Sequence, residues 1–178
     1  MAATKHTLVA IVQDKPGVLN RVVSLFRRRG FNIDSIAVGH SEVPHLSRVT
    51  IIVNGTTATI EQVRKQLDKL IDLVKVFDIT SEKIIGRELA LVKVKATSAT
   101  RSEIIEMADI FRANIVDVAS DSLTIEITGD EDKIESMLKL LRGFGIKEIA
   151  RTGRVAMVRG NIGAIPPEER PSRSRGKK

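Results

Sequence analysis

The alternation of hydrophobic and polar residues predicts a regular succession of strands and helices in the first half of the chain. Residues 7–12 form an apolar run that stops at the turn sequence DKPG, residues 14–17, as is typical of a buried strand. Helical spacing begins at Val18 and continues to Gly30, a residue type that often terminates helices. Strands are then expected at 33–38, 49–53 and 74–79, with a second helix at 60–71. The expected order is βαββαβ.

The second half of the chain repeats this order. Strands are expected at 89–95, 115–119, 123–127 and 146–150, with a further strand at 154–158. Thr100 and Glu103 match a capping box at the start of one helix, and Asp130 starts another. A short internal echo supports a duplication, because LFR precedes NID in the first half and IFR precedes NIVD in the second. We therefore expect an α+β fold with two ferredoxin-like βαββαβ domains.

Each predicted helix carries its apolar residues at a spacing that places them on one face, where they are expected to pack on a sheet. These residues are Leu19, Val22, Val23 and Phe26, then Ile60, Val63, Leu67, Leu70 and Ile71, then Ile104, Ile105, Ala108 and Phe111, and finally Ile134, Met137, Leu138 and Leu141. We interpret the two phenylalanines as core residues rather than ligand contacts.

The predicted elements divide the chain into two domains. The first spans residues 5–80 and the second spans 88–160, joined by a linker at 81–87. Residues 161–178 combine prolines, serines and basic side chains with little apolar surface, so we expect a basic, disordered tail. The tail is either a solubilising extension or a docking arm, and its composition fits both interpretations.

Composition and charge argue against a nucleic-acid partner. The 178 residues carry a net charge of +7, but the last eleven, EERPSRSRGKK, alone contribute +3 with five cations and two anions. The run 27–29 is three arginines at a predicted helix end, where cations complement the helix dipole. Aromatic residues make up 3% of the chain, with no Trp or Tyr, which leaves almost no platforms for base stacking.

The sequence offers few candidates for catalysis or metal binding. It contains no cysteine, which excludes disulfides, thiolate zinc sites and iron–sulfur clusters. The only histidines are His6, His40 and His45, and no pair has the spacing of metal ligands on a helix. No nucleophile elbow, Walker loop or GxGxxG motif occurs. These patterns give no sign of an enzyme or of a metal site, and from the residues alone an enzyme stays open.

The chain also shows no sign of membrane association. No apolar run approaches the length of about 18 residues that a membrane span needs. The opening sequence MAATKHTLVAIVQDK lacks the layout of a signal peptide. We expect a cytoplasmic protein with no membrane partner.

The most informative segment is the Pro-Gly turn between the first strand and the first helix. A helix N-terminus presents free backbone amides and the positive end of the helix dipole, so a carboxylate or phosphate can bind there. Gly17 has no side chain to block a ligand that approaches this backbone. The alternative interpretation is that Pro16 and Gly17 simply begin a helix.

Several segments resemble one protein family. DKPGVLNRVVSLFRRRGFNIDSIAVG, followed by LSRVTIIV, is similar to the regulatory (small) subunit of acetohydroxyacid synthase, also called acetolactate synthase. The N-terminal part resembles an ACT domain, a βαββαβ module that binds amino acids. RELALVKV, IFRANIVDV and ARTGRVAMVRG resemble the C-terminal domain of the same subunit, so the resemblance covers about residues 5–160.

The resemblance implies a regulatory chain without catalytic residues. In this family the partner is a large catalytic subunit that carries thiamine diphosphate, magnesium and FAD. That subunit converts two pyruvate molecules to 2-acetolactate and CO2, or condenses pyruvate with 2-oxobutyrate. The small subunit raises this activity and confers feedback inhibition by valine, and in some cases by leucine or isoleucine. The resemblance thus implies no cofactor in this chain and a role in branched-chain amino acid biosynthesis.

The resemblance also implies an effector site between the ACT domains of a homodimer. Gly17, Val18 and Leu19 would offer backbone amides to the effector carboxylate. Asp14 would accept a hydrogen bond from the effector ammonium group, and Pro16 would lie over its aliphatic part.

The remaining wall of the expected site involves the following strand. Asn32 and Ile33 of the second chain would close the pocket, and Val38 would cover the aliphatic branch of the effector. Many relatives carry Asn at the position of Asp14, which leaves the identity of the effector open.

Two other functions stay open at this point. One is a ferredoxin-like nucleic-acid-binding protein that uses the positive charge, which a salt-dependent mobility shift would reveal. The other is an ACT-type amino-acid sensor with a different client. A neighbouring gene for a thiamine-diphosphate synthase would argue against that sensor.

Overall fold

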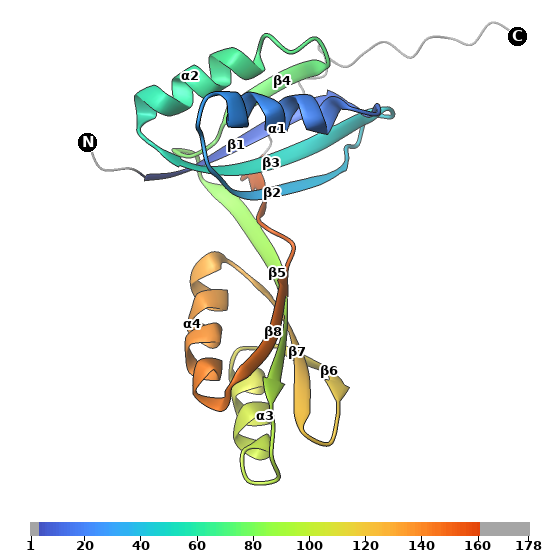
Figure 1. Cartoon of the computed structure of the whole chain (residues 1–178), viewed down its shortest axis with the longest axis vertical. Coiled ribbons are helices and arrows are strands. Elements are labelled where there is room, and N and C mark those ends of the chain that lie inside the picture. Colours follow the sequence, from blue (N-terminus) through green and yellow to red (C-terminus); the bar gives the residue numbers. More distant parts are fainter. Residues whose placement is uncertain (1–3, 161–178) are drawn as a thin grey trace, which may run out of the picture. The chain divides into compact units, whose positions relative to one another are not determined.

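The computed structural model describes residues 4–160, which form two compact units (Figure 1). The first unit contains the chain up to Ile85 and again from Ala156, and the second unit is Gly86–Val155. The strands are β1 (Thr4–Gln13), β2 (Ile33–His40), β3 (Leu46–Gly55), β4 (Leu73–Asp78), β5 (Ile84–Lys95), β6 (Asn114–Val118), β7 (Ser122–Gly129), β8 (Ile146–Arg151) and β9 (Val155–Val158). The helices are α1 (Val18–Arg28), α2 (Thr57–Leu67), α3 (Arg101–Ile110) and α4 (Glu131–Leu141), followed by a 3-10 turn at Arg142–Phe144.

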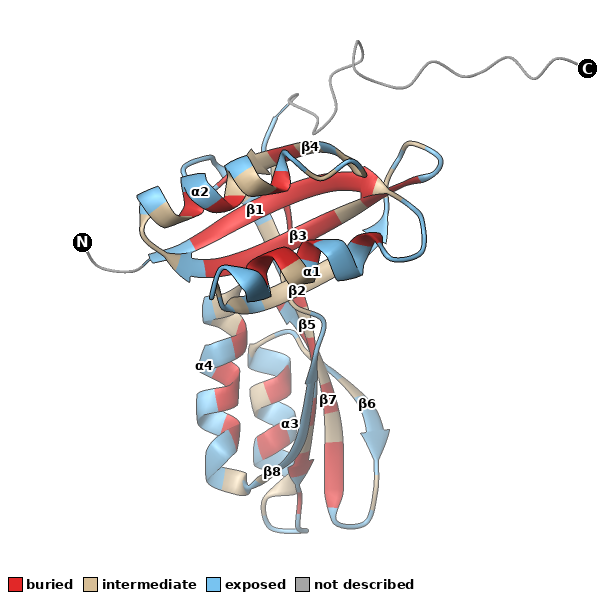
Figure 2. Ribbon diagram, turned by 45° about the horizontal axis from the view of Figure 1, so that its top comes forward, coloured by how far each residue is buried: buried red, intermediate tan, exposed pale blue. Residues whose placement is uncertain are grey.

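The first unit is a four-stranded antiparallel sheet with two helices packed on one face. The strand order is β2-β3-β1-β4, so β2 and β4 are its edges. In Figure 2 the central strands β1 and β3 are buried along most of their length. Successive side chains of a strand point to opposite faces of the sheet, so every second residue of β1 and β3 packs against the helices. This core contains Leu8, Ala10, Val49, Ile51, Val22, Phe26, Ile60 and Val63.

The opposite face of the same sheet is covered by the end of the described chain. Val9 of β1 packs with Ile79 and Ala156, and all three are buried. The Arg48 guanidinium donates a hydrogen bond of 2.6 Å to the carbonyl of Ala156. Burial lowers the pKa of Arg48, while the charge of Glu42 acts in the opposite direction. The return of the chain at β9 therefore completes the first unit.

The second unit repeats the arrangement, with strand order β6-β7-β5-β8. Strand β9, which belongs to the first unit from Ala156 onward, pairs with β5, the strand that itself begins in the first unit at Ile84. Its core lies between the sheet and the helices α3 and α4, and includes Val92, Ile104, Ile125, Ile127, Ile134 and Met137. Arg151 on β8 donates to both carboxylate oxygens of Glu88 at 2.7 and 2.9 Å, and to Glu135 at 2.6 Å. These hydrogen bonds, to Glu88 above all, raise the pKa of Arg151. The expected fold class, α+β with two βαββαβ units, is confirmed.

Several residues predicted for the core lie at the surface instead. Leu19 and Val23 of α1 are 44% and 40% exposed, and Ile105 of α3 is 38% exposed. The sheet covers a narrower arc of each helix than the apolar stripe suggested, so residues at the margin of the stripe face solvent. Ile71 is 87% exposed because α2 ends at Leu67 and a turn follows.

The helix ends agree with the sequence in two cases and differ in one. The Asp130 carboxylate accepts a hydrogen bond from the Lys133 amide at 2.9 Å and caps α4. Gly30 has φ +69°, and the bonds from Gly30 N to Arg27 O and from Phe31 N to Phe26 O close α1. The capping box predicted at Thr100 is wrong, since its hydroxyl accepts from the Thr97 amide at 3.0 Å and makes no cap bond.

The strand limits also refine the expected organisation. The short strand expected at 154–158 is confirmed as β9. Strand β5 begins at Ile84, inside the segment expected to be a linker. The expected tail, 161–178, lies outside the described residues. The domain limits 5–80 and 88–160 stay a prediction.

Candidate functional site

The Pro-Gly turn is held by backbone hydrogen bonds to two neighbouring loops. The amide of Gln13 donates to the carbonyl of Asp72 at 2.9 Å, and the amide of Asp14 donates to the carbonyl of His45 at 2.8 Å. Within the turn, the Val18 amide donates to the Lys15 carbonyl at 3.3 Å. These bonds fix where α1 begins relative to the end of β1.

Gly17 is the N-cap residue of α1 and has a left-handed backbone, with φ +85°. It contributes no side-chain cap, and the first turn of α1 contains no acidic residue. The first intrahelical bond runs from Arg21 N to Gly17 O at 3.0 Å, so the amides of Leu19 and Asn20 precede the helical ladder. A Cβ atom built at Gly17 would have no heavy atom within 4 Å. The helix N-terminus is therefore open to an anion.

The backbone amides of the turn are not all equally suited to bind an effector carboxylate, contrary to the prediction from the sequence. The Val18 amide already has an acceptor in Lys15, and the Val18 side chain is buried in the core. Leu19 and Asn20 are exposed, so their amides are the better candidates to receive a carboxylate. Pro16 is exposed beside them.

Asp14 has a neighbour that sequence reasoning did not identify. Its carboxylate lies 3.2 Å from Nδ1 of His40, and both side chains are substantially exposed. The register explains the contact, because Gln13 of β1 pairs with Leu46 and His40 of β2 pairs with Ser47. The ends of β1 and β2 thus meet at one end of the sheet. The contact between Asp14 and His40 could have been predicted only from the pairing register of the strands, which local periodicity does not reveal.

The predicted site residues fall into two groups within one chain. Asp14, Pro16, Gly17, Leu19 and Val38 belong to the end of the sheet where β1 and β2 terminate. The Val38 side chain is 49% exposed there.

Asn32 and Ile33 lie towards the other end of the sheet. Ile33 pairs with Val53, the residue that also pairs with His6 near the start of β1. The five residue steps from Ile33 to Val38 correspond to about 16 Å along a strand. The Asn32 side chain is exposed, and its Nδ2 donates a hydrogen bond to Oδ1 of Asp34 at 3.4 Å. A single chain does not bring the two groups together.

The described part of the chain shows neither a metal-binding cluster nor a membrane-spanning helix. Within residues 4–160, no group of three or more His, Cys, Asp or Glu side chains is arranged to hold a metal ion. No helix in this range is long and apolar enough to cross a membrane.

Comparisons with known proteins assign both units to one family. Residues 8–75 match the family profile described as "AHAS small subunit-like ACT domain", and residues 87–160 match "Small subunit of acetolactate synthase". A relative from Archaeoglobus fulgidus, named "Probable acetolactate synthase small subunit", is 57% identical over 157 residues, covering 88% of this chain and 98% of its own. The "Acetolactate synthase small subunit" of Mycobacterium bovis is 49% identical over 163 residues, covering 92% and 97%. The chain belongs to the acetolactate synthase small subunit family.

A solved structure agrees with this assignment. The crystal structure of the acetolactate synthase small subunit from Thermotoga maritima has a TM-score of 0.82 and 45% identity, and it covers 89% of this chain and 99% of that chain. The resemblance stated from the sequence is confirmed. As a member of the acetolactate synthase small subunit family, the chain has an ACT domain in its first unit, and the family name associates it with a regulatory role.

Proposed function

We propose that this chain binds the large catalytic subunit of acetolactate synthase, raises its activity and makes it sensitive to feedback inhibition by valine or another branched-chain amino acid. The observation that carries the proposal is the match to small subunits over nearly the whole length of both chains. Thiamine diphosphate, magnesium and FAD would bind to the large subunit, which converts pyruvate to 2-acetolactate. The complex would act in the cytoplasm, and this chain would supply no catalytic group.

The open edge of the first sheet supports a homodimer. Strand β2 lies at an edge of the described sheet, and an edge strand is a template for pairing with another strand. A two-fold axis beside an edge strand pairs that strand with itself in antiparallel fashion. An axis between Ile36 and Ala37 would place the partner's Ile33 opposite His40, since the two residues are equally far from that point. This pairing would bring the two separated groups of site residues together.

The effector would bind where these groups meet. Its carboxylate would accept hydrogen bonds from the amides of Leu19 and Asn20 at the open end of α1. Its ammonium group would lie near Asp14, which already faces His40 at 3.2 Å. The exposed side chain of Val38 would contact the aliphatic branch. The partner's Asn32 would close the opposite wall.

The test is reconstitution with the cognate large subunit supplied with its cofactors. Acetolactate formation is measured with and without the chain, and then against increasing valine, leucine and isoleucine. We expect activation without effector and inhibition by at least one of the three amino acids. Failure to activate any cognate large subunit would refute the proposed partner. Activation without inhibition would refute the effector role alone.

Asn32→Ala tests the shared site specifically. Loss of a hydrogen bond to a charged group weakens binding by about 1.5–3 kcal/mol, or roughly 10- to 150-fold in effector affinity. Asn114→Ala is the matched control, because Asn114 holds the corresponding position in the second unit and donates to Glu126 at 3.2 Å. We expect the control to keep normal inhibition, and sedimentation to show a dimer for both variants. A monomer at micromolar concentration, with or without valine, would contradict the shared pocket.

A further inference from the structure

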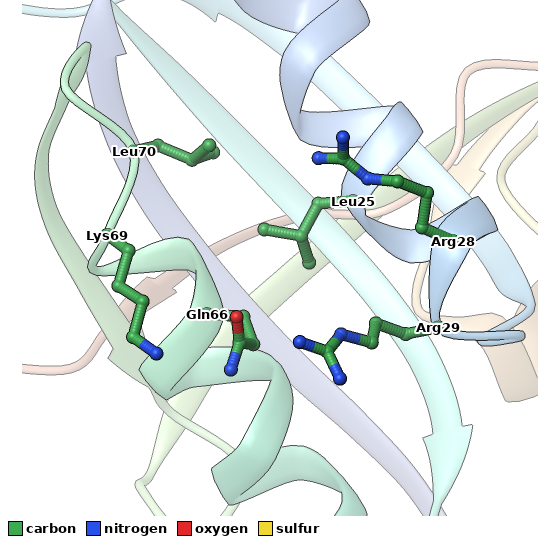
Figure 3. Close-up of a pocket in the computed structure, with 6 residues that line it drawn as sticks. All are labelled: Leu25, Arg28, Arg29, Gln66, Lys69 and Leu70. Atoms are coloured by element: carbon green, nitrogen blue, oxygen red, sulfur yellow. The ribbon is translucent and has the colours of Figure 1, made fainter.

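A hollow in the first unit lies between the C-terminal ends of α1 and α2, apart from the Pro-Gly turn. It has a volume of about 400 Å³. It is lined by Leu25, Arg28, Arg29, Gln66, Lys69 and Leu70. Figure 3 shows the guanidinium groups of Arg28 and Arg29 extending from the end of α1 towards α2, with Gln66 and Lys69 on the α2 side. The hollow begins where α1 ends, and this 11-residue helix separates it from Gly17 by about 16 Å.

The positive charge of this hollow is not balanced by its own lining. The part of the chain that the structure describes contributes no carboxylate to these walls. The two acidic residues nearby in sequence are paired elsewhere. Asp68 lies 3.8 Å from Arg64, and Asp72 is bonded to Arg21.

The negative C-terminal ends of the two helix dipoles do not neutralise the charge of the three basic residues. The last carbonyls of α1 already accept backbone bonds, from Arg29 N and Phe31 N to Phe26 O and from Gly30 N to Arg27 O. The last carbonyls of α2 do the same, since Lys69 N donates to Gln66 O and Leu70 N donates to Leu67 O. Each helix end carries roughly half a negative charge, so three cations against two ends leave a net charge of about +2.

We propose that this hollow binds a compact anion with at least two negative charges, of the diphosphate class. Guanidinium groups match the oxygen geometry of phosphoryl groups, and the lysine adds a third donor. Leu25 is buried and Leu70 is half-buried, which gives the hollow an apolar floor. The site is separate from the proposed effector site and does not depend on it.

Titration calorimetry of the full chain with pyrophosphate, at constant ionic strength, tests the site. Removing a charge that bonds directly to the anion weakens binding about tenfold or more, so Arg28→Gln, Arg29→Gln and Lys69→Gln should each raise the Kd by that factor. Arg27→Gln is the matched control. It removes the same charge from the same exposed helix end without touching the lining, and it should change the Kd by about threefold at most.

The outcomes separate a built site from general attraction to a basic protein. Binding of pyrophosphate that depends on Arg28, Arg29 and Lys69 supports the proposal, and citrate titrated in parallel shows whether carboxylates can replace the phosphoryl groups. Three results would overturn the proposal. The first is the absence of saturable binding. The second is a loss of affinity in Arg27→Gln as large as in the lining variants, and the third is a Kd that none of the three lining variants alters. All three lining residues are at the surface or partly exposed, so thermal melting should show an intact fold for each variant.

Discussion

Gly17 allows the effect of charge at the helix N-terminus to be separated from the effect of backbone strain. Its φ of +85° is unfavourable for most residues, while a new Cβ atom would meet no heavy atom within 4 Å. A left-handed residue costs about 1–2 kcal/mol for most L-amino acids, and less for Asn and Asp. Gly17→Asp and Gly17→Asn therefore carry similar strain and similar bulk, and they differ in one negative charge.

The size of the charge effect follows from the proposed position of the effector carboxylate. At a separation of about 5 Å, two negative charges repel by about 1 kcal/mol in water and about 3 kcal/mol at an effective dielectric constant near 20. The site is open to solvent on one side, so the range between these limits applies. Gly17→Asp should need roughly 5- to 150-fold more valine for half-maximal inhibition than Gly17→Asn.

The assay measures acetolactate formation by the reconstituted enzyme against valine concentration for both variants. Both should still activate the large subunit without valine, because the substitution changes only the turn proposed to bind the effector. Thermal melting of both variants checks that strain is matched. Equal valine sensitivity in the two variants would refute a carboxylate site at this helix end. Loss of activation in both would instead place the turn in the subunit interface.

The remaining predictions concern stability and are measured by urea denaturation. Arg151→Met should lower the free energy of unfolding by about 3 kcal/mol, because Glu88, only 9% exposed, would lose its bidentate partner. Arg48→Met should lower it by about 1–2 kcal/mol through loss of the hydrogen bond to Ala156. Asp130→Ala should lower it by about 1 kcal/mol, since α4 would lose its side-chain cap.

Lys93→Met is the control for these stability measurements. Lys93 lies 4.0 Å from Glu148, and Glu148 is well exposed, so the change should be within about 1 kcal/mol. A loss as large as that of Arg151→Met would contradict the argument that burial of Glu88 decides the difference.

The sequence predicted the elements well because their signals are local. Alternation over a strand and helical spacing depend on a few consecutive residues, and Val22 and Phe26 are buried as expected. How much of a helix circumference is buried depends on the sheet that it packs against. For this reason Leu19 was predicted to lie in the core although it is exposed. Thr100 does not cap α3, because its hydroxyl oxygen accepts a hydrogen bond from the backbone amide of Thr97, three residues earlier.

The candidate site was predicted only in part, for a similar reason. The open turn at Gly17 follows from adjacent residues, and the structure shows that its helix end has no side-chain cap. The contact of Asp14 with His40 depends on the register of three strands, which local patterns do not encode. The role of Asn32 depends on a second chain and stays a prediction.

The return of the chain at Ala156 makes the second unit an insertion within the first. As the ribosome releases the chain, Gly86–Val155 can fold as an uninterrupted segment, whereas the first unit lacks its last strand until nearly all of the protein has emerged. A fragment that ends at Ile85 would leave Val9 and Ile79 on a bare sheet face, a surface that favours aggregation. Separate expression of the first unit therefore calls for a gene from which Gly86–Val155 is deleted, so that the segment from Ala156 is joined directly to Ile85.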